Sequence, residues 1–256
     1  MASSLFDLTG KSALITGGSR GLGRAMARGF AEAGADVMIT SRHEDELRAA
    51  VGVISKGLSQ RVEMLVCDMT DLKQVDDLAK QAISRLGKVD ILVNNAGTNI
   101  PQPIDQVTDQ AWETTMLLNL TSVMRLTRAL VPAMKARKWG RIIHISSVLG
   151  LGGKEGRNSY CATKAALTGL ARASALDLGP SNVTVNCIAP GPFLTDLPGK
   201  LLSDEQKKHF AARTAFGRWG KPEEIVGPAL MLASEAGSYV TGSTLVVDGG
   251  NLARTL

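Results

Sequence analysis

The chain has 256 residues, of which 44% are hydrophobic and 21% are charged, and its formal net charge is +5. This length suffices for one large α/β domain with a substantial core, while no apolar run approaches the ~20 residues of a membrane-spanning helix. The N-terminal residues lack a basic start followed by a long apolar core, so we expect no secretory signal, no membrane partner and a cytoplasmic location.

The composition also disfavours nucleic acid and metal as partners. Basic residues are spread along the chain and only 4% of residues are aromatic, so small anionic ligands account better for the charge than a nucleic acid does. Cys67, Cys161 and Cys187 are odd in number and lie far apart in apolar surroundings. They indicate buried reduced thiols rather than a disulfide framework, and no metal site is expected.

Short apolar runs alternate with helical stretches along the whole chain. Most of these runs are rich in Val and Ile with little strict alternation, which is typical of strands buried on both faces. The predicted strands are 12–16, 36–40, 61–67, 89–95, 141–146, 183–189 and 243–248, and the predicted helices are 24–34, 44–56, 72–87, 108–137 and 159–179. This order favours an α/β fold of the Rossmann type, with a doubly wound, seven-stranded parallel sheet between helices.

One long stretch, 190–218, shows no regular pattern. It follows the carboxyl end of a predicted strand, where open α/β sheets bind ligands, and irregular segments of this length are usually functional. We therefore expect a single dinucleotide-binding and catalytic domain over 1–256, with a mobile substrate lid at about 190–218.

The first predicted strand is followed by a glycine-rich loop that contains Gly17, Gly21 and Gly23. Glycines allow a tight turn and a close approach of backbone N–H groups to a pyrophosphate, and the N-terminus of the next helix adds positive potential. A glycine pattern alone is weak, but its place at the first strand-to-helix junction favours a dinucleotide site.

The residues after the second strand indicate which dinucleotide binds. NAD sites usually place a carboxylate there, whereas this chain has Thr40, Ser41 and Arg42, and Arg20 lies in the glycine loop. Two guanidinium groups can hold a 2′-phosphate, so we predict NADP(H). In the less favoured alternative both arginines pair with nearby acids such as Glu44 or Asp45.

Two further turns lie at the same predicted sheet edge. Asp68, followed by Met69, either accepts a hydrogen bond from the adenine amino group or forms a local turn before a helix capped by Thr70. The fourth strand ends in the small-residue turn 94–97, which lets a cofactor lie against the sheet.

Tyr160 and Lys164 are four residues apart in a predicted helix that Asn158 or Ser159 can cap, so they share one face. The fifth strand ends in Ser146 and Ser147 at the same sheet edge. A positive charge ~5 Å from a phenol, at an effective dielectric near 20, contributes about 3 kcal/mol and lowers its pKa by roughly 2 units. This predicts a tyrosine acid-base group; the alternative is a surface pair with the lysine stem on the ring.

Two other polar residues lie within predicted regular elements. Asn119, a mediocre helix former, either bends its helix and holds a water next to Lys164 or is a tolerated polar residue on a semi-exposed face, and the sequence alone favours the second. His144 lies among isoleucines in a predicted strand, which indicates a core residue rather than a catalyst.

Together the segments TGGSRGLG, NNAG, YCATK and PGPFLT, with Asn119 and Ser147, resemble the short-chain dehydrogenase/reductase family over nearly the whole chain. The resemblance implies a catalytic tetrad of Asn119, Ser147, Tyr160 and Lys164. In it Ser147 orients the substrate oxygen, Tyr160 exchanges its proton, Asn119 holds a relay water and Lys164 also binds the nicotinamide ribose. It further implies that the segment from Pro190 contacts the carboxamide end of the cofactor, and that the chain forms a homotetramer through its long helices.

The combined prediction is an oxidoreductase that transfers hydride between NADP(H) and a secondary alcohol or ketone. The alternative of another class is a non-catalytic dinucleotide sensor, which would typically show an incomplete tetrad. The residues expected to bind the cofactor are Gly17, Ser19, Arg20, Gly21, Leu22, Gly23, Ser41, Arg42, Asp68, Met69, Asn95, Ala96, Gly97, Tyr160, Lys164, Pro190, Gly191, Phe193 and Thr195.

The expected small-molecule substrate is a sugar acid or polyol, because the chain is similar to gluconate 5-dehydrogenases. The alternative is a 3-oxoacyl-acyl-carrier-protein reductase. That group commonly has an NxGQxN-like run before the tyrosine and a basic residue ahead of the sixth strand, whereas this chain has LGGKEGRNS and Ser181-Asn182. Basic residues such as Lys154, Arg157 and Arg213 in the substrate regions suit a carboxylate or a phosphopantetheine, although most are ordinary surface charges.

Overall fold

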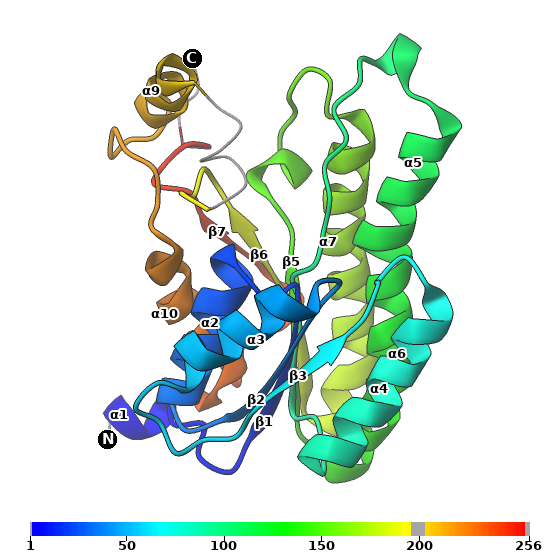
Figure 1. Cartoon of the computed structure of the whole chain (residues 1–256), viewed down its shortest axis with the longest axis vertical. Helices are drawn as coiled ribbons and strands as arrows, with labels where there is room; N and C mark the ends of the chain where they lie inside the picture. The colour runs from blue at the N-terminus through cyan, green and yellow to red at the C-terminus, as the bar shows by residue number, and fades with distance from the viewer. Residues whose placement is uncertain (1, 196–202, 254–256) are drawn as a thin grey trace.

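The computed structural model of the chain describes residues 2–195 and 203–253. Seven strands form one parallel sheet, as predicted, and their order is β3-β2-β1-β4-β5-β6-β7 (Figure 1). The strands are β1 (Ser12–Thr16), β2 (Asp36–Ser41), β3 (Val62–Val66), β4 (Ile91–Asn94), β5 (Gly140–Ile145), β6 (Val183–Pro190) and β7 (Thr244–Val247). The strand order reverses between β1 and β4, which places a ligand-binding crevice at their carboxyl ends.

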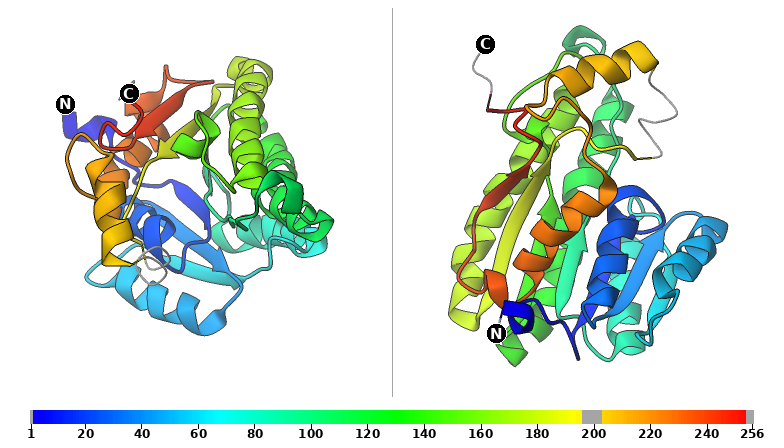
Figure 2. Two further views of the ribbon diagram at one scale, coloured as in Figure 1. Left: turned by 90° about the horizontal axis from the view of Figure 1, so that it is seen from above. Right: turned by 90° about the vertical axis from the view of Figure 1, so that its left-hand side faces the viewer.

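Helices cover both faces of the sheet, as Figure 2 shows. The helices are α1 (Ala2–Leu5), α2 (Gly21–Glu32), α3 (Glu44–Ser55), α4 (Leu72–Leu86), α5 (Asp109–Met116), α6 (Ser122–Arg137), α7 (Asn158–Leu178), α9 (Asp204–Ala212) and α10 (Val226–Ala233). Helices α2, α3 and α10 share a core with one side of the sheet, and α4, α6 and α7 share a core with the other. In β1, Ile15 faces the first core and Leu14 the second, because successive strand side chains point to opposite faces.

The structure differs from two of the predicted segments and contains one helix that was not predicted. The helix predicted over 108–137 is divided into α5 and α6 by a π-helical turn at Leu117–Thr121. The stretch 190–218, predicted to be irregular, contains α9, which begins with a capping box between Ser203 and Gln206. Helix α10 was not predicted, because its sequence VGPALMLA is short, contains Gly and Pro and has no polar face.

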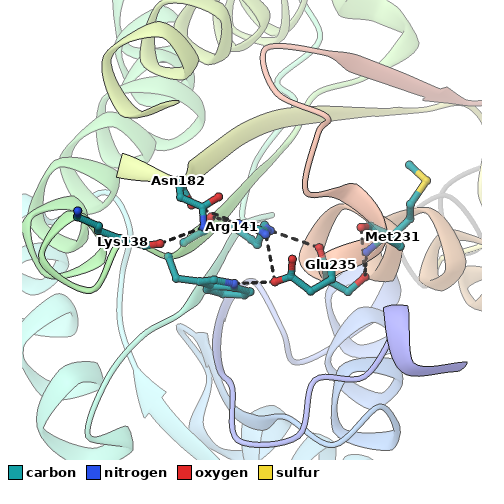
Figure 3. Close-up of polar contacts among 9 residues, drawn as sticks. Lys138, Arg141, Asn182, Met231 and Glu235 are labelled. Carbon is teal, nitrogen blue, oxygen red and sulfur yellow. Dashed lines mark hydrogen bonds and ion pairs between the residues drawn. The ribbon is translucent and has the colours of Figure 1, made fainter. Parts of the chain in front are cut away.

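The amino end of the sheet contains a fully buried cation. The guanidinium of Arg141, at the start of β5, donates to the backbone oxygens of Ser234 at 3.3 Å and Asn182 at 3.4 Å (Figure 3). It also lies 3.4 Å from Glu235 Oε1, which accepts a 2.8 Å hydrogen bond from Trp139 Nε1. These contacts join β5 to the segment after α10, at the end of the strands opposite the predicted site.

Among the described residues no helix is long and apolar enough to cross a membrane.

Candidate active site

The glycine loop lies directly against the turn that follows β4. A Cβ atom on Gly23 would lie 2.3 Å from the oxygen of Gly17, and one on Gly17, whose φ is +65°, would lie 3.0 Å from Ala96 Cα. Asn95 Nδ2 donates to the oxygens of Thr16 at 2.9 Å and Gly17 at 3.0 Å. These glycines are therefore required by backbone contact, and the loop and the turn form one surface.

Thr16 also helps to shape the site, although it was not predicted from the sequence. Its Oγ1 accepts hydrogen bonds from the backbone amides of Asn95 and Ala96, each at 3.0 Å. The hydroxyl at the end of β1 thus fixes the turn after β4. A threonine directly before a glycine loop was the only available signal, and it is not specific.

The start of α2 is suited to an anionic group. Arg20 is at the N-cap position but its side chain makes no capping hydrogen bond, and the first turn contains the predicted residues Gly21, Leu22 and Gly23. Uncapped amides together with the helix dipole favour a phosphate. The residues at this position fit the pyrophosphate of a dinucleotide.

The two predicted arginines behave differently. Arg20 Nη1 lies 3.6 Å from Glu46 Oε1, and Ser19 Oγ donates to Glu46 Oε2 at 3.1 Å. Arg42 is exposed after Ser41 and forms no ion pair within the described ranges. The alternative with paired arginines is thus correct for Arg20, although its partner is Glu46 rather than Glu44 or Asp45. The predicted two-arginine clamp is not preassembled.

The turn after β3 is held locally. Asp68 Oδ1 accepts from the amide of Thr70 at 2.9 Å and from its hydroxyl at 2.7 Å, and Met69 is buried. The prediction that Thr70 caps the next helix is wrong: Asp71 is the N-cap of α4 and accepts from the amide of Lys73 at 2.9 Å. The Asp71 carboxylate accepts from the first amides of α4, whereas the Thr70 hydroxyl donates to Asp68.

The cysteines are free, and burial raises the pKa of the Cys67 and Cys187 thiols to about 12, while Cys161 is half-buried. Thus the prediction of buried reduced thiols holds for two of the three. In the described part of the chain no group of metal-ligating side chains is present.

Ser147 and Tyr160 come together at the carboxyl end of β5. Ser147 Oγ accepts from the amide of Leu149 at 3.1 Å, and the Ser147 side chain is close enough to Tyr160 to influence the pKa of the phenol. Burial raises the pKa of the Tyr160 phenol, and the hydrogen bond with Ser147 opposes this effect. The predicted lowering of that pKa by Lys164 is therefore wrong for the chain alone, because desolvation outweighs the nearby positive groups.

Lys164 is 4% exposed, and its Nζ lies 5.5 Å from the ring centroid of Tyr160. Nζ donates to the oxygen of Ile145 at 2.7 Å, and Ser146 Oγ donates to the backbone oxygen of Lys164 at 2.8 Å. Burial lowers the pKa of the Lys164 ammonium to about 8. The surface-pair alternative is excluded, because this lysine is an interior residue tied to β5.

Asn119 is fully buried in the π-helical turn, so the preference for a tolerated, semi-exposed residue is wrong. Its Oδ1 accepts from the amide of Thr98 at 2.8 Å, and its Nδ2 donates to the oxygen of Thr98 at 2.9 Å and to Thr163 Oγ1 at 3.1 Å. A Cβ atom on Gly97 would lie 3.2 Å from Asn119 Oδ1 and 3.5 Å from Lys164 Nζ. Asn119 and Lys164 therefore meet at this glycine.

The start of α7 is not capped as predicted. Arg157 is at the N-cap position, and Asn158 Nδ2 instead donates to the oxygen of Gln102 at 3.1 Å. Gln102 also donates its amide to the oxygen of Gly156 at 2.9 Å. These bonds place loop 98–103 beside the segment that precedes Tyr160.

The segment after β6 lies next to the glycine loop. A Cβ atom on Gly21 would lie 3.2 Å from Thr195 Cγ2, and one on Gly191, directly after Pro190, would lie 2.6 Å from Asp248 Cβ. Phe193 is buried and pairs with Gly220. Of the predicted lid, residues 196–202 lie outside the described residues.

His144 is fully buried, as predicted, and its Nδ1 lies 3.0 Å from Asn94 Nδ2. Desolvation, with a smaller effect of the Lys164 charge, lowers the His144 pKa to about 4. The imidazole is therefore neutral at physiological pH.

Three cations gather where α9 meets the loop before α7. Lys154 Nζ lies 4.0 Å from the ring centroid of Phe210, and burial followed by the charges of Arg157 and Arg213 lowers its pKa. The Arg157 charge also acts on Tyr160. None of the three cations has an ion-pair partner among the described residues.

Known reductases match this chain over most of its length. A family model described as enoyl-(acyl carrier protein) reductase matches residues 17–251. The 3-oxoacyl-[acyl-carrier-protein] reductase of Escherichia coli is 39% identical over 244 residues, which cover 95% of this chain and 98% of that protein.

Two solved structures have the same fold. A putative NAD(P)-dependent gluconate 5-dehydrogenase from Beutenbergia cavernae, with bound NADP, has a TM-score of 0.92 and 39% identity, over 98% of this chain and all of that chain. A gluconate 5-dehydrogenase from Burkholderia cenocepacia, in complex with NADP and tartrate, has a TM-score of 0.93 and 35% identity over the whole of both chains. The glycine loop, the buried lysine beside a tyrosine and these full-length matches show that the chain belongs to the short-chain dehydrogenase/reductase family of oxidoreductases.

Proposed function

We propose that this chain is an NADP(H)-dependent oxidoreductase that interconverts a secondary alcohol and a ketone, with Tyr160 as the general acid and base. The observation that carries the proposal is the gathering of Ser147, Tyr160 and Lys164 at the carboxyl edge of β5: Ser147 and Tyr160 interact, and the buried Lys164 Nζ lies 5.5 Å from the centroid of the Tyr160 ring. When bound, the cofactor supplies or accepts a hydride. The side chains described below orient the substrate and move its proton.

Ser147 and Tyr160 have complementary tasks in this proposal. A substrate oxygen between them accepts the Ser147 hydroxyl and exchanges a proton with the Tyr160 phenol. Because burial raises the pKa of Tyr160, the phenol is protonated at neutral pH, the form that a carbonyl reduction requires. Alcohol oxidation requires tyrosinate, so we expect its rate to rise with pH.

Lys164 and Asn119 support this chemistry from within the fold. Lys164 has a pKa of about 8, so near physiological pH its ammonium can release a proton and the resulting amine can take one up, while Nζ still donates to the oxygen of Ile145. Asn119 holds Thr98 through both of its backbone polar groups and lies beside Lys164. We assign it to positioning the floor of the site and a relay water.

The nucleotide is held by backbone and guanidinium groups in this proposal. The uncapped first turn of α2 fits the pyrophosphate, and Arg20 and Arg42 suit the 2′-phosphate, since β2 ends in Ser41 rather than in a carboxylate. The NADP in the related structures supports this assignment. We expect NADPH to be preferred over NADH by at least about tenfold, equivalent to ~1.4 kcal/mol, in steady-state kinetics.

The substrate class that fits best is a sugar acid or a related hydroxy acid. Lys154, Arg157 and Arg213 form a cationic group without ion-pair partners among the described residues, the Arg157 charge reaches Tyr160, and an anionic substrate would relieve their mutual repulsion, which Glu155 offsets only in part at Lys154. The related structure with bound tartrate, a hydroxylated dicarboxylate, supports this class. A 3-oxoacyl-acyl-carrier-protein substrate is the second candidate, because the E. coli relative acts on it and the same cations suit a phosphopantetheine phosphate.

An apolar groove on the outer face of the helices bears on how copies of this chain assemble. A groove of about 590 Å³ runs between α6 and α7 and is lined by Met124, Val131 and Leu170 among others. None of its lining residues belongs to the tetrad, and it lies toward the far end of α7 from Tyr160. We propose that a second copy covers this face within a homotetramer, which light scattering would test; a monomeric mass would contradict it.

The decisive experiment compares Tyr160→Phe with wild-type protein. We expect NADPH binding to persist, because the ring is retained, while turnover of a gluconate-type keto acid or a simple diketone falls by roughly 10²- to 10⁴-fold through loss of acid-base catalysis. Lys164→Ala should weaken nucleotide binding as well as turnover. Near-wild-type turnover of Tyr160→Phe would refute the assignment, and wild-type protein that binds NADPH but reduces no carbonyl compound would favour the sensor alternative.

A further inference from the structure

Two side chains of the glycine loop that are expected to bind NADP(H), Ser19 and Arg20, already contact a carboxylate. Glu46 accepts the Ser19 hydroxyl at 3.1 Å and lies 3.6 Å from the Arg20 guanidinium. It belongs to the first turn of α3, which begins shortly after β2 ends. β2 therefore ends without a carboxylate, but Glu46 on the following helix brings a carboxylate to the glycine loop.

Glu46 differs in this respect from its neighbours in the same turn. Glu44 pairs with Arg48 one helical turn further along α3, on the exposed side. Ser19 is 6% exposed, and its hydroxyl has Glu46 as its acceptor. The side chains of Arg20 and Glu46 are about half exposed, at 51% and 40%, so both can rearrange when a ligand enters.

The two nucleotides place opposite demands on this position. A 2′-phosphate carries up to two negative charges and needs the donors that Glu46 occupies, so the carboxylate both competes with it and repels it. A ribose 2′-hydroxyl instead donates a hydrogen bond, and a carboxylate is its usual acceptor in NAD sites. The charge of Glu46 therefore opposes NADP(H) and suits NAD(H).

We propose that Glu46 limits the preference of this protein for NADP(H) over NAD(H), by holding Ser19 and Arg20 away from the 2′-phosphate and by accepting the ribose hydroxyls of NAD(H). The proposal rests on the nucleotide site put forward above, but not on the substrate or on Tyr160. Glu46 would then influence which nucleotide binds without itself binding the pyrophosphate.

Titration calorimetry at low salt tests the proposal without turnover. The variant is Glu46→Gln, and Glu44→Gln is the matched control, because it removes the same charge from the same helical turn without touching the glycine loop. We expect Glu46→Gln to bind 2′,5′-ADP and NADP⁺ at least about threefold more tightly, a typical effect of an exposed ion pair. Binding of 5′-AMP should be unchanged and NAD⁺ should bind no more tightly. The gain should shrink in high salt, and Glu44→Gln should show a smaller change.

Several results would overturn the proposal. Unchanged or weaker binding of 2′,5′-ADP by Glu46→Gln would show that the carboxylate positions Arg20 for the phosphate, and equal gains for NADP⁺ and NAD⁺ would show an unspecific charge effect. Glu46→Asp keeps the charge but moves it away from Ser19 and Arg20, so we expect a smaller gain in 2′,5′-ADP affinity than for Glu46→Gln. Circular dichroism checks that each variant is folded. Wild-type protein that binds neither nucleotide would refute the nucleotide site itself, a different outcome from an unchanged ratio.

Discussion

The ammonium of Lys164 donates a 2.7 Å hydrogen bond to the backbone oxygen of Ile145, the last residue of β5. A bond from a helix side chain to the final carbonyl of the neighbouring strand fixes where the lysine lies relative to the sheet edge. It also satisfies a charge that is almost removed from water, although burial still lowers the pKa of Lys164 to about 8.

This pKa predicts a specific pH dependence of stability. The folded pKa of about 8 is below the ordinary value of 10.5, so between these two pH values the unfolded chain binds a proton that the folded chain does not. The contribution of Lys164 to the free energy of unfolding therefore rises with pH across this window and is lost as pH falls through it. Thermal unfolding of wild-type protein and Lys164→Met at pH 7 to 10 should show a difference that moves in favour of wild type as pH rises. Parallel curves would contradict the lowered pKa.

A pair of glycine substitutions should have opposite effects. Gly23→Ala would place a methyl group 2.3 Å from the oxygen of Gly17, so we expect loss of nucleotide binding together with lower stability. Gly52→Ala in the interior of α3 meets no atom within 4 Å and should stabilise the chain by roughly 0.5–1 kcal/mol through its helix propensity. Chemical denaturation and calorimetry with NADP⁺ measure both, and nucleotide binding by Gly23→Ala equal to that of wild type would be the contrary outcome.

The buried cation at the amino end of the sheet should matter for stability but not for catalysis. Arg141→Met would remove the buried guanidinium that donates to the backbone oxygens of Ser234 and Asn182 and lies beside Glu235, and we expect the free energy of unfolding in denaturant to fall by an amount on the order of 2–4 kcal/mol. Arg48→Met removes an exposed ion pair and should cost less than about 1 kcal/mol. Turnover per folded molecule should stay near wild type at low temperature; a selective loss of turnover would show that this end of β5 influences the site.

The cationic group near Tyr160 predicts how substrate charge is recognised. Lys154→Met and Arg213→Gln should raise KM for a keto carboxylate several-fold, on the order of 1 kcal/mol per lost charge contact, with little change in kcat. A neutral diketone should show no such change, and neither should Lys80→Met, whose charge pairs with Asp77 on α4. Equal effects on charged and neutral substrates would indicate that Lys154 acts through its contact with Phe210 rather than through its charge.

The sequence by itself determined the fold class and the main groups of the site. Apolar runs and helical periodicity are local properties, and they were sufficient for all seven strands, because strands buried on both faces leave a strong signal. The glycine loop was also recognisable from sequence, since the positive φ of Gly17 and the contact of Gly23 with the Gly17 oxygen arise within the loop itself. So was the placement of Tyr160 and Lys164 on one face, which depends only on helical spacing.

Only the tertiary structure decided the features that join distant parts of the chain. The burial of Asn119 depends on Thr98 and Thr163, and the partner of Arg20 is Glu46 on a later helix. The pKa of Tyr160 likewise depends on how much protein surrounds the phenol, and desolvation raises it although helical spacing places Lys164 on the same face. Spacing along the chain fixes which residues share an element, whereas hydrogen-bond partners and desolvation are set by distances between elements, which no local pattern encodes.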